Sequence, residues 1–190
     1  MSSNTSSFTK LQDLLPQLFQ RSALTGNLYL RCRLGVSDTF LIPMEYVRES
    51  LLLEGNHITP LPQMSSFVMG LMTSRERVFS VVDLPQLMGF SPLPTYSRQY
   101  HVVVISVSPF LPKYSQDEEI FLGLAVNQIE GITRMSTEKV SSLGEVQNLL
   151  EMDRIGHWFS LTPYLQGWVE RENEKPLALL NLKSIVQATQ

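Results

Sequence analysis

The stretch ITPLPQMSSFVMGLMTSRERVFSVVDL (Ile58–Leu84) decides how the chain can fold. It contains two apolar runs, Phe67–Met72 and Val78–Val82, separated by the polar residues Thr73–Arg77. Apolar runs of this length, bounded by a polar turn, are typical of two strands joined as a hairpin. The segment therefore predicts a hairpin with the arginines of Thr73–Arg77 at its tip, directed outward.

The same order of features recurs near the end of the chain, in residues 164–186. Each copy has an aromatic residue three positions before a glycine (Gly70 or Gly167), then a charged turn, an apolar run and an Asx-Leu pair. A glycine inside a strand predicts a bulge or a close approach of another backbone. Asp83 and Asn181 are predicted to cap short helices by accepting backbone N–H bonds. The repeat indicates two small β modules that share one core.

Other strands are predicted from alternation and from β-branched residues. Cys32 falls on the inner face of the strand 27–34, which favours a small core residue over a reactive thiol. A weaker internal repeat relates Met44–Glu49 to Val126–Gly131. Many short strands with regular turns predict a mostly β sandwich or barrel. The further expected strands are 39–43, 46–53, 100–107, 120–126, 128–134, 157–161, 164–169 and 176–180.

The N-terminal residues 1–26 form an extension before the first predicted strand. Leu11, Leu14, Leu15, Leu18 and Phe19 are spaced as one stripe of a short amphipathic helix. The stripe could cover a groove of its own domain, which we favour, or dock onto a partner. The rest of the chain divides into a first module at about 27–92 and a second at 93–190, with exchange of edge strands left open.

The composition of the chain argues against several classes of function. The net charge is −3, so there is no basic excess to bind nucleic acid. No apolar run approaches the roughly 20 residues needed to span a bilayer, and no direct membrane insertion is expected. The start of the chain lacks the pattern of a secretory signal. The single cysteine fits a reducing compartment such as a cytoplasm.

The sequence contains none of the common catalytic signatures. It has no phosphate-binding loop, dinucleotide fingerprint, nucleophile elbow or zinc-binding spacing. His57, His101 and His157 do not pair, the acidic run Asp117–Glu119 reads as a solvated loop, and both tryptophans (Trp158 and Trp168) suit core positions. We therefore expect no enzyme activity, metal or cofactor, and a binding or scaffolding role by elimination.

The residues of the first module then resemble a known family. Ile58–Pro62, Phe67-Val68-x-Gly70, Arg75 and Val81–Leu84 resemble the signature of the CheW family, the adaptor proteins of bacterial chemosensory arrays. The likeness runs from about Leu28 to Val186. It implies a mostly β fold of two five-stranded barrels around a shared hydrophobic core, with short flanking helices. It also implies a non-catalytic adaptor that couples a methyl-accepting receptor to a CheA-like histidine kinase through the kinase's homologous regulatory domain.

Some residues depart from the family pattern. The hairpin has Glu76 where a glycine is usual, which predicts backbone strain and a differently shaped turn. Asn127 and Asn181 stand where aspartates are usual. These departures suggest a divergent adaptor, similar to those of twitching-motility or phototaxis systems built on type IV pili, located in the cytoplasm and associated with receptor arrays through its partners.

The resemblance also suggests two binding surfaces. Val47, Gly70, Arg75 and Glu76 are expected to line or shape the receptor-binding groove, where a helical receptor tip lays its apolar side chains. An internal salt bridge from Arg75 to Glu49 or Asp83 is an equal alternative.

Exposed apolar residues at a barrel end, with Leu87, Met88 and Phe90 as candidates, are expected to contact the kinase. The alternative is ordinary packing of the short helix, which we favour more for Leu87 than for Phe90. The rival hypotheses are a tandem-barrel module that binds a small ligand between its halves and, third, an enzyme with scattered catalytic residues.

Overall fold

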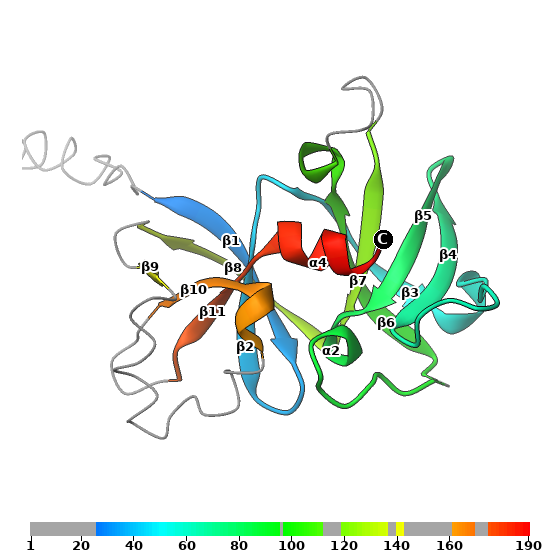
Figure 1. Cartoon of the computed structure of the whole chain (residues 1–190), viewed down its shortest axis with the longest axis horizontal. Coiled ribbons are helices and arrows are strands. Elements are labelled where there is room, and N and C mark those ends of the chain that lie inside the picture. Colours follow the sequence, from blue (N-terminus) through cyan, green and yellow to red (C-terminus); the bar gives the residue numbers. More distant parts are fainter. Residues whose placement is uncertain (1–25, 96, 112–118, 137–139, 143–160, 170–174) are drawn as a thin grey trace, which may run out of the picture.

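Two β-sheets on opposite sides of the molecule form the body of the protein, with two short helices between them (Figure 1). The computed structural model describes residues 26–95, 97–111, 119–136, 140–142, 161–169 and 175–190. Strands dominate these residues, which confirms the predicted mostly β fold with few helices.

Each sheet is named here by its strands. Sheet A has the order β8-β1-β2-β11-β10-β9 and sheet B the order β3-β6-β7-β5-β4. The strands of sheet A are β1 (Asn27–Leu34), β2 (Asp38–Pro43), β8 (Gln128–Met135), β9 (Val140–Ser142), β10 (Leu165–Val169) and β11 (Leu177–Leu180). Those of sheet B are β3 (Val47–Glu54), β4 (Val68–Ser74), β5 (Arg77–Asp83), β6 (Gln99–Ser106) and β7 (Phe121–Val126). The helical segments are η1 (Gly55–His57), α2 (Leu84–Leu87), η2 (Ser108–Phe110) and α4 (Leu182–Ala188).

The two sheets do not correspond to the sequence before and after residues 92 and 93. The chain forms β1 and β2 in sheet A, crosses to sheet B for β3 to β7, and returns to sheet A for β8 to β11. Each sheet therefore contains strands from both halves of the sequence. Sheet B has the expected five strands, while sheet A gains a sixth, the three-residue β9.

The predicted internal repeat is confirmed in the β4–β5–α2 and β10–β11–α4 units. In each unit a register shift at the glycine marks a bulge, before Gly70 in one and before Gly167 in the other. Each Asx residue caps its helix, since Asp83 accepts a bond from the backbone N–H of Gln86 and Asn181 from that of Ser184. Their own N–H groups bond to the carbonyls of Phe67 and Tyr164. Because equivalent bonds form in both units, the two are copies of one structural unit.

The weaker repeat marks the two crossings between the sheets. Met44–Glu49 leaves β2 and begins β3, while Val126–Gly131 leaves β7 and begins β8. Both segments carry a register shift early in the new strand, at Val47/Glu49 in one case and opposite Arg31/Cys32 in the other. The repeat therefore extends to the arrangement of both sheets, in which β1, β2 and β8 of sheet A correspond to β6, β7 and β3 of sheet B.

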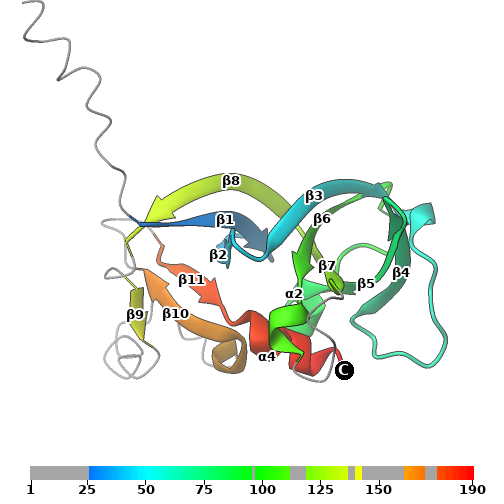
Figure 2. The ribbon, with the colours of Figure 1, turned by 90° about the horizontal axis from the view of Figure 1, so that it is seen from above.

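Three apolar clusters hold the fold together. The central cluster joins both sheets to both helices, and includes Cys32 and Ile42 from sheet A, Val103 and Leu124 from sheet B, and Ile185 from α4. A second cluster fills the concave interior of sheet B, and a smaller third cluster lies inside sheet A. The helices α2 and α4 both lie where the two sheets meet (Figure 2). The expected shared core is thus confirmed.

Trp168 is buried in the central cluster, as expected for an anchor of the core. Several other sequence predictions lie outside the described residues. These are the stripe Leu11–Phe19, the first two residues of the acidic run Asp117–Glu119, Trp158, and the strand at 157–161 except for its last residue, Leu161. Leu161 belongs to a short helical turn rather than a strand.

The two helix caps differ in a way that explains their residue types. The Asp83 carboxylate accepts two bonds, one at 2.9 Å from the Gln86 N–H and one at 2.7 Å from the Leu93 N–H. Asn181 accepts one bond, at 3.1 Å, from the Ser184 N–H. Burial raises the pKa of the Asp83 carboxyl above its usual range, although the two N–H bonds oppose this shift. An aspartate suits the first position because two acceptor oxygens are needed there.

The first prediction concerns the Cys32 thiol. Burial, together with the nearby charge of Glu130, raises its pKa to about 12, so almost no thiolate exists at pH 8. We expect iodoacetamide to leave Cys32 unmodified in the folded protein and to alkylate it after unfolding in urea, as measured by mass spectrometry. Rapid alkylation of the folded protein would contradict the burial of Cys32 in the central core.

The second prediction concerns the Asp83 cap. Asp83→Asn keeps one acceptor but leaves the Leu93 N–H without a partner, and an unsatisfied buried donor costs about 1–3 kcal/mol. We expect the free energy of unfolding, measured by urea denaturation, to fall by that amount.

The matched control for this cap is Asn181→Asp. Asn181 is partly exposed and one acceptor is enough there, and Asn and Asp are nearly equivalent N-caps. The control should therefore change the stability little. Equal effects of the two substitutions would refute the distinction between the caps.

Candidate functional site

The β4–β5 hairpin has a two-residue turn at the sheet B end of the molecule (Figure 1). Ser74 and Arg77 form the last pair of the ladder, and Arg75 and Glu76 have φ angles of 47° and 66°. Two residues with positive φ are typical of a type I′ hairpin turn. Glu76 therefore adopts the positive φ that a glycine would supply, and the backbone of the turn is strained because neither residue is a glycine. The turn is shorter than the polar segment Thr73–Arg77.

An ion pair links the hairpin tip to the opposite edge of sheet B. Arg75 Nε lies 3.5 Å from Glu49 Oε2, and Ser74 Oγ lies 3.4 Å from Glu49 Oε1. Since β3 and β4 are the two edge strands of sheet B, these contacts bridge the open side of a curved sheet. Of the two acidic partners considered for Arg75, the structure shows Glu49 rather than the buried Asp83.

The two partners of this ion pair differ in exposure. The Arg75 side chain is 81% exposed and the Glu49 side chain 17% exposed. Glu49 Oε2 accepts no hydrogen bond, so its contact with Arg75 is electrostatic. A guanidinium has five N–H donors, and most of those of Arg75 face solvent. Arg75 can therefore remain paired with Glu49 and still contact another molecule.

Two further arginines, Arg77 and Arg48, make contacts between strands of sheet B or with the segment before β7. The Arg77 guanidinium lies over the Phe121 ring, 4.6 Å from its centroid. Arg48 on β3 forms an ion pair of 2.7 Å with Glu119. Sequence reasoning missed Ser74, Arg77 and Glu119 because their partners come from strands that are distant in the chain.

Gly70 has a structural role away from the hairpin tip. It is buried near the start of β4 with a φ of 144°, and a Cβ atom there would lie 2.2 Å from the Thr59 carbonyl oxygen. The close approach allows Thr59 and Leu71 to exchange two backbone bonds of 2.8 Å. Gly70 can thus shape a binding surface only through the path of the backbone. Val47 lies partly buried against the central core, near Glu49 on β3.

The α2 residues are placed differently from expectation. Leu87 and Met88 are 8% and 3% exposed, so the prediction that they offer an exposed apolar surface is wrong. The helix is one turn long and inserts them into the central core. Phe90 is partly buried and packs edge-to-face on Phe40, with ring centroids 5.9 Å apart.

An exposed valine follows the glycine that contacts Phe90. Val36 at the β1–β2 turn is 93% exposed, and its neighbour Gly35 contacts the Phe90 ring so closely that a Cβ would lie 3.0 Å from it. Val36 is therefore an exposed apolar residue next in sequence to the glycine that contacts Phe90, where sheet A meets α2. The sequence signalled a turn at Val36, but not the contact between Gly35 and Phe90.

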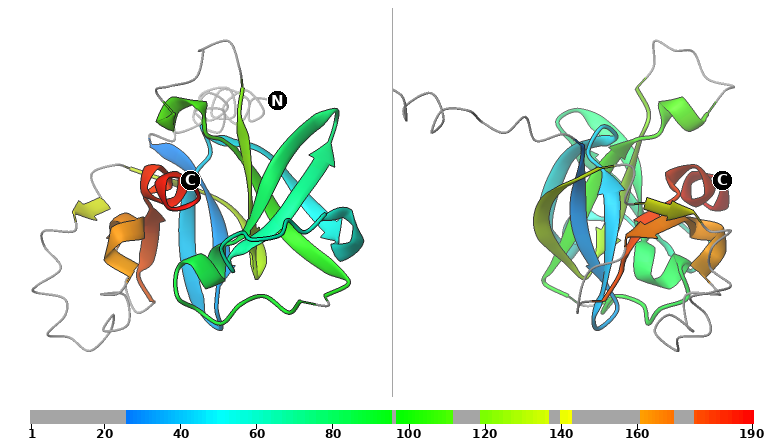
Figure 3. Two further views of the ribbon diagram at one scale, coloured as in Figure 1. Left: turned by 45° about the vertical axis from the view of Figure 1, so that its right-hand side comes forward. Right: turned by 90° about the vertical axis from the view of Figure 1, so that its left-hand side faces the viewer.

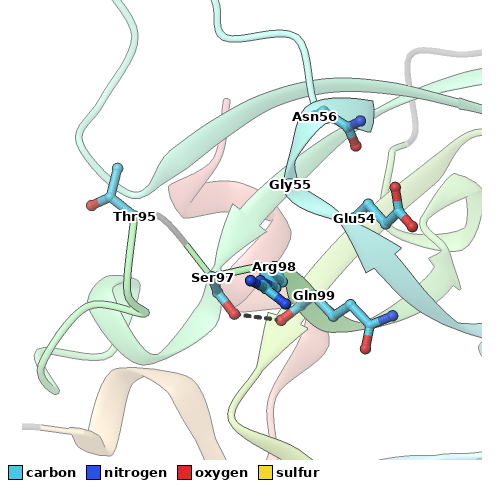
Figure 4. A pocket seen from close by; sticks show the side chains of 7 residues that line it. All are labelled: Glu54, Gly55, Asn56, Thr95, Ser97, Arg98 and Gln99. Carbon is cyan, nitrogen blue, oxygen red and sulfur yellow. Dashed lines mark hydrogen bonds between the residues drawn. The ribbon is translucent and has the colours of Figure 1, made fainter.

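The hollows lined by described residues lie at loops and barrel mouths. One, shown in Figure 4, is an open polar depression between the end of β3 and the segment before β6, lined by Glu54, Asn56, Thr95, Arg98 and others. Among the described residues, no group of His, Cys, Asp or Glu is arranged to hold a metal ion. No helix in the described part has the length and apolar character needed to cross a membrane.

These features define a class of protein: a two-subdomain β fold with a shared core, whose solvent-facing side chains gather at a hairpin tip and at a sheet–helix junction. Residues 28–190 match the CheW-like domain family model. The chain therefore belongs to the CheW-like family, whose members are non-catalytic scaffold proteins of chemotaxis signalling.

A solved structure agrees with this assignment. The crystal structure of the scaffolding protein TtCheW from Thermoanaerobacter tengcongensis is similar, with a TM-score of 0.59 and 13% sequence identity over 83% of this chain and 90% of that one. At this identity the similarity supports the fold alone. No curated protein sequence matches the chain significantly.

The ion pair at the hairpin tip yields a third prediction. Because Arg75 is largely exposed, we expect a double-mutant cycle with Glu49→Gln and Arg75→Gln to give a coupling energy of at most about 1 kcal/mol. Urea denaturation of the four proteins measures it. A coupling of several kcal/mol, or loss of the fold in Arg75→Gln, would show that the pair is a structural requirement.

Proposed function

We propose that this protein is an adaptor that couples the cytoplasmic tip of a methyl-accepting receptor to the regulatory domain of a CheA-like histidine kinase. Membership of the CheW-like family supports the scaffold role. The observation that carries the proposal further is the pair of separate exposed surfaces, one at the Arg75 hairpin and one at Val36 and Phe90. An adaptor needs two such surfaces because it holds two partners at once.

The receptor surface is assigned to the hairpin side of sheet B. Arg75 and Glu76 stand at the exposed tip, Val47 offers a partly buried apolar surface on β3, and Gly70 sets the backbone path of β4. A helical receptor tip presents both carboxylates and apolar side chains. Arg75 suits the carboxylates because its planar head donates several hydrogen bonds.

The kinase surface is assigned to the junction of the β1–β2 turn with α2. Phe90 and Val36 provide the apolar contact, while Leu87 and Met88 lie beneath and fix the position of Phe90 through the core. Each contact is expected to be modest in area and individually weak. An array of receptors and kinases then gains strength because many such contacts act together.

The cellular setting follows from the divergence of the hairpin. The positive φ at Glu76, where a glycine would be unstrained, supports an adaptor specialised for its own receptor. We place it in the cytoplasm, at receptor arrays, in a system that controls motility by type IV pili in response to a chemical or light stimulus. The alternative of a small ligand between the two halves lacks a supporting observation, since apolar side chains from both sheets and both helices occupy that space.

The fourth prediction tests the two surfaces separately. We expect Arg75→Ala to weaken binding of the receptor's cytoplasmic hairpin by about tenfold, equivalent to about 1.4 kcal/mol, and to leave binding of the kinase regulatory domain unchanged. Val36→Asp should have the opposite pattern. Isothermal titration calorimetry with the purified domains from the same organism measures both.

Two control variants accompany this test. Arg98→Ala removes an exposed arginine just before β6, away from the hairpin, and Met64→Asp charges an exposed apolar loop residue. Both should bind like the wild type. If wild-type protein binds neither domain, the adaptor proposal fails. If Arg75→Ala is folded, by circular dichroism, and binds the receptor normally, the assignment of that surface is wrong.

A further inference from the structure

The turn between β1 and β2 consists of Gly35, Val36 and Ser37, because Leu34↔Asp38 is the last pair of the ladder. In both views of Figure 3 this turn (blue) lies at the lower end of the molecule. Val36 is 93% exposed and is the residue of the turn that offers apolar surface to a partner. Val36 presents that surface in one place only if the turn is held in one conformation.

Gly35 is the residue of the turn that the fold constrains most. Its φ of 65° lies in the left-handed region, and a Cβ atom there would lie 3.0 Å from Cδ1 of the Phe90 ring. Glycine is therefore required both by the backbone and by the nearby ring. Because glycine has the most conformational freedom, a turn without further restraint would sample several backbone conformations. The restraint has to come from contacts outside the turn.

One such contact comes from Asn127, the single residue between β7 and β8. Its side-chain Oδ1 accepts a bond of 2.8 Å from the Gly35 N–H, and its own N–H donates a bond of 3.2 Å to the Arg33 carbonyl. The two bonds join the end of β1 to the crossing between the sheets. The bond to Gly35 is partly buried, so water competes with it less than at an exposed site.

A second contact restrains the other side of the turn. Lys175 Nζ donates a bond of 2.6 Å to Ser37 Oγ and lies 3.9 Å from Asp38 Oδ1. The Lys175 side chain is 65% exposed, and an ion pair of this kind contributes little. Of the two contacts, the bond from Gly35 to Asn127 is therefore the stronger restraint.

We propose that Asn127 is a positioning residue of the kinase surface. Its side-chain oxygen fixes Gly35, and this holds the exposed Val36 in a defined place relative to Phe90 before the kinase binds. A surface that is already ordered loses less conformational entropy on binding, so the same contacts give a higher affinity. The inference rests on the proposed kinase surface at Val36 and Phe90, and it requires no contact between Asn127 and the kinase.

The chain offers a conservative variant and a matched control. Asn127→Ala removes the acceptor, whereas Asn127→Asp keeps an oxygen at the same place. The repeat of Met44–Glu49 and Val126–Gly131 aligns Asn127 with Glu45, which is exposed and whose carbonyl accepts a bond from Arg48. Glu45 follows the end of β2 opposite to the turn, so Glu45→Ala changes the equivalent crossing and leaves the turn intact.

Hydrogen exchange in the free, full-length protein, followed by NMR, tests the restraint. We expect the Gly35 amide to exchange about tenfold faster in Asn127→Ala than in the wild type, because its acceptor is absent. Asn127→Asp and Glu45→Ala should keep the wild-type protection. Equal protection of Gly35 in the wild type and in Asn127→Ala would overturn the inference.

Isothermal titration calorimetry with the kinase regulatory domain from the same organism tests the consequence for binding. We expect Asn127→Ala to bind about fivefold more weakly than the wild type, because its turn has to be ordered on binding. Asn127→Asp and Glu45→Ala should bind the kinase domain like the wild type, and all three variants should bind the receptor hairpin normally. If Asn127→Ala does not fold, Asn127→Gln, which displaces the oxygen, replaces it with the same expectations.

The outcomes separate this inference from the adaptor proposal. If Asn127→Ala loses the protection of Gly35 but binds the kinase domain as tightly as the wild type, the inference is wrong and the adaptor proposal stands. The same conclusion follows if Asn127→Asp binds as weakly as Asn127→Ala, since the acceptor oxygen would then not matter. If the wild-type protein does not bind the kinase domain, both are wrong.

Discussion

The fold depends on the two crossings of the chain between the sheets. Because β3 continues from β2 and β8 continues from β7, each sheet is completed by strands from the other half of the sequence. The outer faces of the two curved sheets are consequently held against each other, and the central apolar cluster forms between them together with α2 and α4. Neither sheet could bury that face without the other, so the two subdomains form one folding unit.

Local features were readable from the sequence, and long-range ones were not. The bulges at Gly70 and Gly167 and the caps at Asp83 and Asn181 depend on residues close in the chain, so the repeat predicted them. The pairing of β2 with β11 and of β5 with β7 is parallel and joins distant segments, and alternation of side chains carries no signal of partner choice. The repeat indicated two modules with a shared core, and the resemblance to a family added that each module is a five-stranded barrel.

The same distinction between local and long-range features applies to the residues of the candidate surfaces. Arg75 was recognised, and its partner Glu49 was one of two acids considered, but only the fold shows that their strands are the two edges of sheet B. For Leu87 and Met88 the sequence left open a kinase contact and ordinary packing, because a one-turn apolar helix gives no sign of its packing partners, and the structure shows packing. Val36 was overlooked because a turn in the sequence gives no sign that the adjacent Gly35 contacts the Phe90 ring.

The parallel pairing of β2 with β11 has a consequence for biosynthesis. During translation β1 and β2 emerge well before β11, which lies far along the sequence. The apolar side of the β1–β2 hairpin therefore stays uncovered on the ribosome for most of synthesis, and distant pairings of this kind form slowly. The nascent polypeptide is a natural client for holding chaperones until its last strand is released.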